Sequence, residues 1–369
     1  MQRKQNLKGP MKKEKSIVFI HMLNNFSGSP NVLSVVAEEI YRRGIETNII
    51  TSFNNQGFLS NTPASKKINI NYSFYHNKLL RLFEFVKFQI LSTFSVLSQP
   101  KEKVIYINTI LPFLPAIISK LKGNRVIYHI HEAYPQKGIF QKICFWCAEF
   151  ASEKILCVSQ YVKNNLSETA KQKAVVIYNA LDSSFTDNII EKKKHPVKTL
   201  LMISSARTYK GILEFAKLSS ELPAYNFVLV CDASEKEIEQ IFPEKYLILS
   251  NLKIYSTQKN LHPFYASADL IVNFSNPHLI VETFGLTILE GMYYGLPAIV
   301  PTIGGITELV DNEENGLKID VNDFDTLKKG VISIFETPEL YNKMSKKALL
   351  KAQHFDRDIQ IQKINDELF

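Results

Sequence analysis

The chain has few cysteines, a single tryptophan and no long apolar run among its 369 residues. Four cysteines are too few for the disulfide framework of a small secreted domain. Cys144 and Cys147 form a lone Cys-x-x-Cys pair with no second Cys or His pair nearby, so we expect core cysteines rather than a zinc or redox site. No apolar stretch reaches the length of a membrane span, and the basic start lacks the apolar segment of a signal peptide.

Charge is distributed unevenly along the chain. Residues 1–200 contain 28 Lys and Arg against 13 Asp and Glu, whereas residues 201–369 contain 16 against 23. A basic half followed by an acidic half indicates two domains with different partners, and the length allows each domain a core of its own. Basic surface can bind nucleic acid, anionic lipid or a phosphorylated substrate.

Alternating strand and helix patterns occur twice. The first series opens with a strand at 15–23, a loop, and a helix for which Ser29 is expected to be the N-cap and Pro30 the first position. The charged segment 191–198 carries no periodicity and is predicted to be a linker, after which the pattern restarts. This predicts an α/β protein with two Rossmann-like domains facing a central cleft, with ligands beyond the carboxyl ends of the strands.

The predicted boundaries follow from this pattern. They are a basic N-terminal extension at 1–14, an acceptor-binding domain at 15–192, a nucleotide-sugar-binding domain at 197–350 and a C-terminal helix at 351–369.

Two glutamates, Glu282 and Glu290, stand in the segment 281–305, which is otherwise nearly all apolar or glycine. A glutamate in a short helix can face water, but a buried carboxylate needs a partner because burying it alone is costly. No Lys or Arg lies between Lys259 and Lys318, which leaves a distant ion pair or a ligand. The residues alone leave a structural role and a ligand-binding role equally open.

The segment 265–317 resembles the donor-site segment of family 4 glycosyltransferases of GT-B fold, whose hallmark is two glutamates separated by seven residues. The resemblance covers most of 15–369 and continues, in the order that the family requires, at 128–132, 157–162, 176–182 and 204–216. It implies a retaining transfer of a sugar from a nucleotide-sugar donor to a saccharide or lipid-linked acceptor, in surface polysaccharide or glycolipid synthesis. We also expect that no metal or other cofactor is required.

The resemblance assigns the donor site to the second domain. It implies that Glu290 binds the ribose and that Glu282 lies on the side of the donor sugar. The amides that open the short helix after Gly285 can attract phosphate or sugar hydroxyls, and Gly285 lets the backbone approach a ligand. The expected donor-binding residues are Glu290, Phe284, Gly285, Leu286, Thr287, Arg207, Lys210 and Tyr255.

Four residues are expected to be catalytic: His131, Glu282, Arg207 and Lys210. The last two precede a helix and resemble the Arg and Lys that hold the leaving diphosphate in the family, although such a pair can also be solvated surface charge. His131 is preferred over His129, which the alternation of the strand places on the same face. Gly28, Ser29 and Glu132 are assigned to the first loop or the acceptor; the loop has Ser-Gly-Ser where the family commonly has two glycines.

Other features have competing interpretations. Asp323 and Asp325, and likewise Asp356 and Asp358, stand at expected helix starts and are interpreted as caps rather than metal ligands. The segment 74–97, rich in Phe and Leu with Lys and Arg between them, is a helix packed on the sheet or a surface for anionic membrane. We expect a cytoplasmic protein, peripheral on the membrane if that surface binds it, with no nucleic-acid partner. Alternatives are a nucleotide-sugar epimerase of the same fold, or a non-catalytic binder of anionic polymer or membrane.

Overall fold

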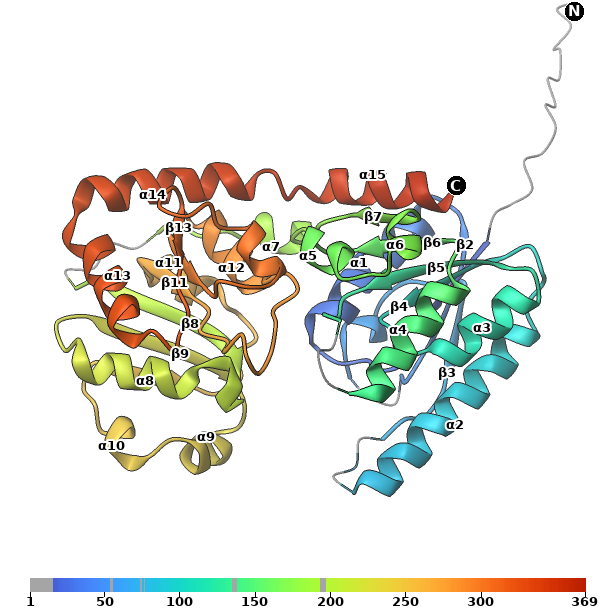
Figure 1. Cartoon of the computed structure of the whole chain (residues 1–369), viewed down its shortest axis with the longest axis horizontal. Helices are drawn as coiled ribbons and strands as arrows, with labels where there is room; N and C mark the ends of the chain where they lie inside the picture. Colours follow the sequence, from blue (N-terminus) through green and yellow to red (C-terminus); the bar gives the residue numbers. More distant parts are fainter. Residues whose placement is uncertain (1–15, 54–55, 74, 76, 135–137, 193–196) are drawn as a thin grey trace, which may run out of the picture. The chain divides into compact units, whose positions relative to one another are not determined.

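The computed structural model describes residues 16–53, 56–73, 75, 77–134, 138–192 and 197–369 (Figure 1). The predicted extension at 1–14 and the centre of the predicted linker lie outside the described residues. The chain divides into two compact units. The first comprises the chain up to Cys157 with 165–176 and 363–369, and the second comprises 158–164 and 177–362. The chain therefore passes between the units several times, whereas the sequence predicted one boundary at 193–196 and a returning C-terminal helix.

The first unit is built on a parallel sheet of seven strands in the order β3-β2-β1-β4-β5-β6-β7. The strands are β1 (Ser16–Ile20), β2 (Glu46–Thr51), β3 (Lys66–Asn69), β4 (Val104–Asn108), β5 (Arg125–Ile130), β6 (Lys154–Cys157) and β7 (Ala174–Val176). Its helices are α1 (Gly28–Arg42), the 3₁₀ turn η1 (Phe58–Ser60), α2 (Lys78–Leu97), α3 (Phe113–Leu121), α4 (Ile139–Ala151) and α6 (Glu168–Lys171).

The central strands of this sheet are buried along their whole length. β1 pairs in parallel with β2 on one side and β4 on the other, with Phe19 opposite Tyr106. Strands covered on both faces read as continuous apolar runs, which is why these segments were recognisable in the sequence. Strand order reverses between β1 and β4, so the carboxyl ends of these two strands form the switch point at which such sheets bind ligands.

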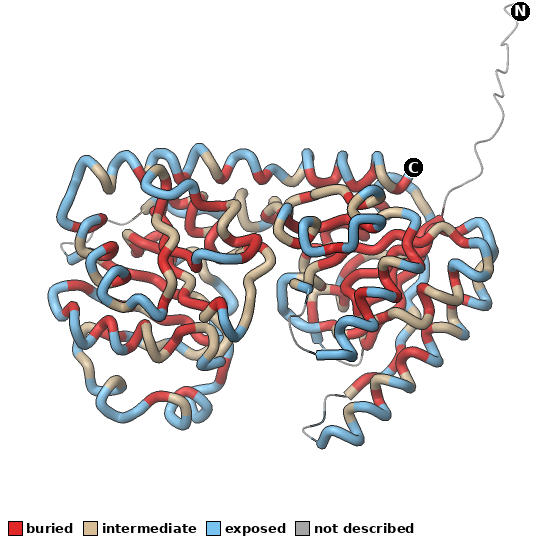
Figure 2. Tube along the Cα trace, viewed as in Figure 1, coloured by how far each residue is buried: buried red, intermediate tan, exposed pale blue. Residues whose placement is uncertain are grey.

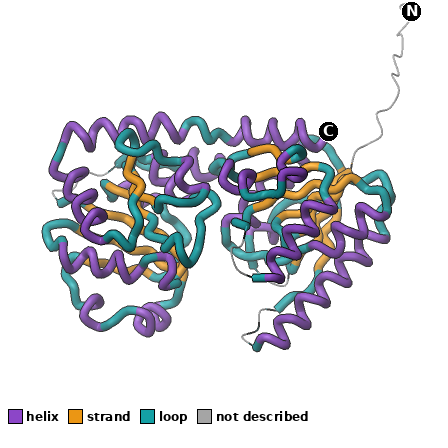
Figure 3. Tube along the Cα trace, in the orientation of Figure 1, coloured by secondary structure: helices purple, strands orange, loops and turns teal. Residues whose placement is uncertain are grey.

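The second unit has a parallel six-stranded sheet in the order β10-β9-β8-β11-β12-β13, with its switch point between β8 and β11. The strands are orange in Figure 3. The strands are β8 (Thr199–Ser205), β9 (Asn226–Asp232), β10 (Leu252–Tyr255), β11 (Leu270–Val272), β12 (Ala298–Val300) and β13 (Gly316–Lys318). Its helices are α5 (Gln160–Asn164), α7 (Ser183–Thr186), η2 (Thr208–Lys210), α8 (Ile212–Glu221), α9 (Glu235–Ile241), α10 (Glu244–Leu247), α11 (His262–Ser267), α12 (Leu286–Tyr293), η3 (Gly305–Glu308), α13 (Phe324–Glu336) and α14 (Pro338–Ala352).

Each unit has its own buried core (Figure 2). In the second unit the Phe215 ring packs against Phe227 at 5.2 Å and Phe274 at 6.0 Å, which joins α8 to the sheet. In the first unit Cys144 and Cys147 are buried, unpaired thiols on the inner side of α4, as predicted. Among the described residues, no helix combines the length and the apolar character needed to cross a bilayer.

The start of α1 differs from the prediction. The helix begins at Gly28 and its N-cap is Ser27, not Ser29. The reason is a local turn, because the Asn25 side chain accepts hydrogen bonds from the Ser27 amide at 3.1 Å and the Ser27 hydroxyl at 2.5 Å. Pro30 is tolerated two positions further in because the first amides of a helix have no partner within it.

The two Asp-x-Asp sequences cap helices, as predicted. Asp323 accepts a hydrogen bond from the Thr326 amide at 3.2 Å at the start of α13. Asp356 accepts from the amides of Asp358 and Ile359, at 2.8 and 3.0 Å, at the start of α15 (Arg357–Leu368).

The end of α15 belongs to the first unit. The Arg125 guanidinium donates to the backbone carbonyls of Leu368 at 2.7 Å and Glu367 at 3.0 Å. Lys154 pairs with the Glu367 carboxylate at 3.0 Å. The carboxyl end of the last helix is thereby held by two basic residues, which suits the negative end of a helix dipole.

Candidate active site

Lys210 and Glu282, both predicted to be catalytic, meet at the switch point of the second sheet. Lys210 follows β8 and Glu282 follows β11, and the Lys210 ammonium lies 2.5 Å from Glu282 Oε1. The same oxygen accepts from the Ser275 hydroxyl at 2.7 Å and the Asn273 amide at 3.3 Å. The distant ion pair that the sequence left open is therefore present, between residues far apart in the chain.

Glycines bring these loops together. A Cβ on Gly211, which has φ +78°, would collide with the backbone of Phe274, so only glycine lets the turn after β8 lie against the end of β11. A Cβ on Gly305 would collide with the carbonyl of Thr283. The backbone at Gly211 and the backbone at Gly305 therefore lie close to the segment that carries Glu282. A side chain at either glycine would prevent this close approach.

The ion pair determines the charge of Glu282. Burial alone would raise the pKa of this carboxyl, but the charge of Lys210 and the hydrogen bonds from Lys210, Ser275 and Asn273 outweigh burial and lower it. Both side chains are about four-fifths buried, with 19% of Glu282 and 18% of Lys210 exposed. Glu282 is consequently an ionised acceptor held in a fixed position.

Glu290 lies on α12 in a different environment. The Tyr265 hydroxyl, from α11, donates to Glu290 Oε2, and Tyr265 itself is fully buried. Burial raises the pKa of Glu290 to about 7, and the hydrogen bond from Tyr265 opposes that shift. No cation is paired with Glu290 among the described residues. The two glutamates thus differ, because one is a fixed carboxylate and the other can titrate near neutral pH.

The start of α12 has the geometry expected of a ligand-binding turn. Gly285 is its N-cap with φ +108°, a conformation that favours glycine, and a Cβ there would lie 2.7 Å from Ile306. Leu286 and Thr287 form the first turn and are half-buried. The Phe284 side chain is buried against Phe355 at 5.7 Å, so only its backbone is available to a ligand.

Arg207 and Tyr255 lie at the carboxyl ends of β8 and β10. Arg207 is the exposed N-cap of η2, close in sequence to Lys210. Tyr255 is 37% exposed and packs edge-on against Phe264 at 5.0 Å. It borders a pocket of about 360 Å³ that also includes Ser256 and Gln258. Tyr255 is therefore accessible to a ligand at this pocket, as a donor-binding residue must be.

In the first unit, Asn108 links the ends of three neighbouring strands. It ends β4, His21 follows β1 and His131 follows β5. Asn108 Oδ1 lies 2.9 Å from His131 Nε2, and Asn108 Nδ2 lies 3.1 Å from His21 Nδ1. Asn108 Nδ2 also donates to the carbonyl of Ser29 at 3.1 Å, which ties the first loop to the same residue.

These contacts define the state of His131. Because Asn108 Nδ2 donates to a carbonyl, its Oδ1 faces His131, and His131 Nε2 must carry the hydrogen. Burial, with smaller contributions from His129 and His21, holds the pKa of His131 well below its usual value, so the ring is neutral at pH 7. His129 lies on the same face, as predicted, with its ring 4.3 Å from that of His131. It is fully buried and bonded to the Tyr106 hydroxyl at 2.7 Å, which favours a structural role.

Glu132 joins two loops of the first unit. Its carboxylate accepts from the amides of Ile110 at 3.3 Å and His131 at 3.1 Å, and burial raises its pKa to about 7. These two bonds hold the loops after β4 and β5 together, and the assignment of Glu132 to the first loop or the acceptor stays a prediction. Thr109, between Asn108 and Ile110, has φ +72°, a strained conformation for a β-branched residue of the kind that gathers at functional sites. Gly28 is exposed and Ser29 half-buried in the first turn of α1.

Sequence reasoning missed Asn108, His21, Tyr265 and the pair Asn273 and Ser275. A usable signal was present for the first two, since both are polar residues directly at the end of an apolar strand. The sequence does not mark Tyr265 as a functional residue, because a tyrosine in an apolar helix is expected to be part of the hydrophobic core. Within the described parts of the chain, no cluster of three or more His, Cys, Asp or Glu side chains could hold a metal ion.

Comparison with known proteins gives two family matches that adjoin. Residues 26–185 match the model described as Glycosyltransferase Family 4, and residues 185–351 match the model described as Glycosyl transferases group 1. A glycosyltransferase of Haemophilus influenzae, of uncharacterised activity, is 22% identical over 364 residues, or 95% of this chain and 97% of its own.

Shorter matches occur with other relatives. N-acetyl-alpha-D-glucosaminyl L-malate synthase of Bacillus anthracis is 27% identical over 210 residues, 53% of this chain and 54% of its own. An uncharacterised glycosyltransferase of Methanocaldococcus jannaschii is 28% identical over 190 residues, 51% of each chain. The chain thus spans about half the length of these two relatives.

Solved structures show the same fold. Anabaena HepE, determined in complex with UDP and glucose, has a TM-score of 0.77 at 18% identity, covering 96% of this chain and 99% of its own. The lipopolysaccharide outer core galactosyltransferase WaaB has a TM-score of 0.71 at 16% identity, with coverage of 96% and 99%. These likenesses confirm the predicted GT-B architecture of two Rossmann-like domains.

Proposed function

Since the chain belongs to the glycosyltransferases of the family 4 type, we propose that it is a retaining enzyme that takes its sugar from a nucleotide-diphosphate sugar. Its second unit binds the donor, and its first unit binds a saccharide or lipid-linked acceptor. The product would belong to a surface polysaccharide or glycolipid.

The observation that carries this proposal is the contrast between Glu282 and Glu290. A carboxylate has two acceptor oxygens. Among the described residues Glu290 accepts a hydrogen bond from the Tyr265 hydroxyl alone, which leaves acceptor capacity for the neighbouring hydroxyls of a ribose. Ionising Glu290 next to such donors offsets the burial that raises its pKa to about 7. HepE, which shares the fold, was determined with UDP and glucose.

Lys210 and Arg207 would neutralise the diphosphate. The Lys210 ammonium already lies against Glu282, so the arriving diphosphate would share a cation that is in position rather than recruit one from solvent. When the bond between the anomeric carbon and the diphosphate breaks, negative charge grows on the leaving oxygen, and fixed cations stabilise that charge most in the transition state. No metal is required in this proposal.

Retention follows from same-face substitution. The acceptor oxygen forms its bond to the anomeric carbon on the face that the diphosphate leaves, and the acceptor proton passes to a diphosphate oxygen. A neutral His131 suits this reaction, because an imidazolium would repel the oxocarbenium-like sugar. His131 would bind a sugar hydroxyl, held in place by Asn108.

The test is a binding panel of UDP-, GDP-, ADP-, CMP- and dTDP-linked sugars measured by thermal shift. A nucleotide sugar at a hundred times its dissociation constant should add about 2.7 kcal/mol to the stability of the wild type. Glu290→Ala should lose most of that gain, whereas Glu314→Ala, at an exposed carboxylate on the loop before β13, should keep it. If no nucleotide sugar shifts the wild type, the proposed donor class is wrong.

Product analysis then separates the alternatives. NMR of the product from an α-linked donor should show an α-linkage, as retention requires. An epimerase would instead convert the donor without an acceptor, and a non-catalytic binder would leave the donor unchanged.

A further inference from the structure

Helix α2 of the first unit exposes an apolar stripe along its whole length. Its members recur at helical spacing, so they lie in one line on the outer side, and each has 43–77% of its surface exposed. They are Leu79, Phe83, Val86, Ile90, Phe94 and Leu97. A helix covering a sheet normally places its apolar side inward, so an outer stripe of this size calls for a partner.

The inner side of α2 is the more polar one, and its polar groups are satisfied. Glu84 accepts from the Ser73 amide at 2.9 Å and pairs with Lys87 at 2.5 Å. Gln89 donates to the Leu111 carbonyl at 2.8 Å and accepts from the Leu114 amide at 3.1 Å. The fold therefore fixes the orientation of α2, and the apolar stripe faces outward because specific bonds hold the opposite side inward.

Helix α4 adds a second stripe to this surface. Ile139, Ile143, Trp146 and Phe150 are 42–80% exposed and recur at helical spacing. Phe85 of α2 packs against Phe140 of α4 at 5.4 Å, which brings the first turn of α4 against the N-terminal half of α2. Figure 1 shows α2, α3 and α4 beside one another on one face of the first sheet. We call this surface, made by the two stripes, the α2–α4 face.

Charge on the α2–α4 face has one predominant sign. Lys78 and Lys142 are exposed beside the stripes, and Lys120 of α3 lies over the Phe150 ring at 4.2 Å. The one carboxylate of α2, Glu84, is buried and paired. This arrangement matches an anionic membrane surface, in which the apolar side chains would contact the acyl chains and the lysines would contact the phosphates of the headgroups.

A second copy of the chain fits this surface less well. A two-fold contact places the same patch against itself and would bring the lysines of one copy against those of the other. A soluble anionic polymer would pair with the lysines but leave the apolar stripes in water. We infer that the α2–α4 face docks the first unit onto an anionic lipid bilayer.

Docking there would bring the bilayer to the acceptor side of the first unit. Helices that follow parallel strands begin at the carboxyl edge of the sheet, and α4 begins soon after His131 and Glu132 at that edge. A sugar carried on a lipid would reach the same edge without leaving the membrane. This part of the inference rests on the proposed function, whereas bilayer binding itself does not.

The single tryptophan of the chain, Trp146, lies on the α2–α4 face and is 63% exposed. The experiment mixes the full-length wild type with vesicles of phosphatidylcholine containing phosphatidylglycerol, and with vesicles of phosphatidylcholine alone. Trp146 emission should shift to the blue with the anionic vesicles and be quenched when their acyl chains are brominated. The neutral vesicles should bind more weakly, and salt should weaken binding to the anionic ones.

Variants test which residues carry the binding. Phe83→Ser with Phe94→Ser should lower the vesicle partition coefficient about tenfold or more, because both rings, 64% and 63% exposed, would leave the acyl region. The control is Ile248→Ser with Leu349→Ser, at exposed apolar residues of the second unit, which should change it by less than about twofold.

Three results would overturn the inference. They are unchanged Trp146 emission with anionic vesicles, equal loss in the control pair, or a blue shift that appears without lipid as protein concentration rises, which would indicate a second copy on this face. The vesicle assay needs no donor. A wild type that binds nucleotide sugars but does not bind anionic vesicles would therefore refute the docking face alone.

Discussion

Replacing Lys210 by methionine removes the cation of the best-buried ion pair around the donor site. Glu282 would then be a carboxylate that is about four-fifths buried and has no opposite charge beside it. Breaking a buried pair in this way costs about 3–5 kcal/mol. Because the bonds from Ser275 and Asn273 remain, we expect the lower end, about 3 kcal/mol at pH 7.

The cost should depend on pH in a defined direction. In the wild type the folded pKa of Glu282 is lowered, so its contribution to stability is present at neutral pH and is lost in acid. In Lys210→Met, burial dominates and raises the folded pKa, so the contribution is present in acid and is lost as pH rises. The stability difference between the two proteins should therefore widen from pH 5 to pH 8, by about 1.4 kcal/mol for each unit of the raised pKa.

The assay is scanning calorimetry of full-length proteins. For a unit of this size about 1 kcal/mol corresponds to roughly 2–4 °C, so the transition that contains the second unit should fall by roughly 6–12 °C at pH 7. Lys210→Met with Glu282→Gln should recover to within about 1 kcal/mol of the wild type, because no charge is then left buried. Lys343→Met, whose pair with Glu314 is about half exposed on both sides, should cost less than about 0.5 kcal/mol.

Two results would refute this reasoning. A loss in Lys210→Met no larger than that in Lys343→Met would mean that the pair is solvated. A double variant no more stable than Lys210→Met would mean that lost packing, rather than an unpaired charge, causes the effect.

Three further predictions concern single residues. Nucleotide-sugar affinity, measured by calorimetric titration, should rise between pH 6 and pH 8 as Glu290, with a pKa of about 7, ionises, and Glu290→Gln should abolish the rise. Asn108→Ala should weaken transfer more than donor binding, seen as lower kcat with little change in donor affinity, because it releases His131 from a bond of 2.9 Å; equal losses in both would contradict this. Gly305→Ala should lower the free energy of unfolding, measured by thermal denaturation, by about 1–3 kcal/mol, because its Cβ would collide with the Thr283 carbonyl. An unchanged melting temperature would contradict this, because it would mean that the loop can move to accommodate the Cβ.

The sequence predicted the architecture well because buried parallel strands are recognisable as continuous runs of apolar residues. It left a structural role and a ligand-binding role equally open for the two glutamates, and it placed His129 and His131 on one face, as the structure confirms. It could not predict the pairing of Lys210 with Glu282, because only the strand order β8-β11 makes those two loops neighbours.

Other differences have local causes. The assignment of Phe284 to the donor site stays a prediction that concerns its backbone alone, because its ring is buried against Phe355, a residue far along the chain. The early start of α1 depends on the Asn25 side chain. It accepts hydrogen bonds from Ser27 and so makes Ser27 the N-cap in place of Ser29. Glu308 accepts from the amides of Gln160 and Tyr161 at 2.9 and 2.8 Å and so caps α5, a contact between residues too far apart in the chain for the sequence to predict.

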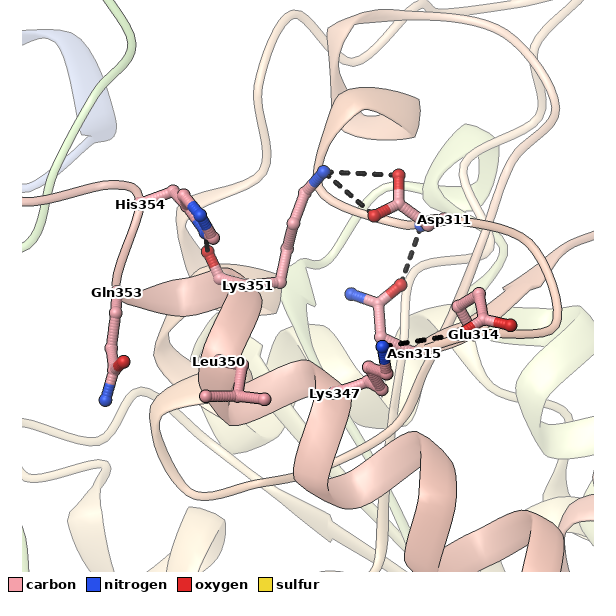
Figure 4. Close-up of a pocket in the computed structure, with 8 residues that line it drawn as sticks. All are labelled: Asp311, Glu314, Asn315, Lys347, Leu350, Lys351, Gln353 and His354. Atoms are coloured by element: carbon pink, nitrogen blue, oxygen red, sulfur yellow. Dashed lines mark hydrogen bonds and ion pairs between the residues drawn. The ribbon is translucent and has the colours of Figure 1, made fainter.

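One pocket of the second unit has no place in the proposed reaction. It measures about 650 Å³ and lies between the end of α14 and the loop before β13 (Figure 4). Its lysines are already matched, because Lys351 pairs with Asp311 at 3.0 Å and Lys347 with Glu314 at 3.8 Å. These pairs fasten α14 to that loop, and the matched charges give an anion little reason to bind there.

The contacts of Arg125 with the last turn of α15 have a consequence for how the protein is made. Most of the first unit leaves the ribosome before the second, yet the carbonyls of Glu367 and Leu368 that receive its guanidinium are synthesised only after residue 362 of the second unit. During translation the first unit must therefore wait, incomplete along this edge, until the whole second unit has been produced. A chain truncated before residue 363 would lack the residues that complete this edge of the first unit. The two units therefore cannot be expressed separately by dividing the gene at a single point between them.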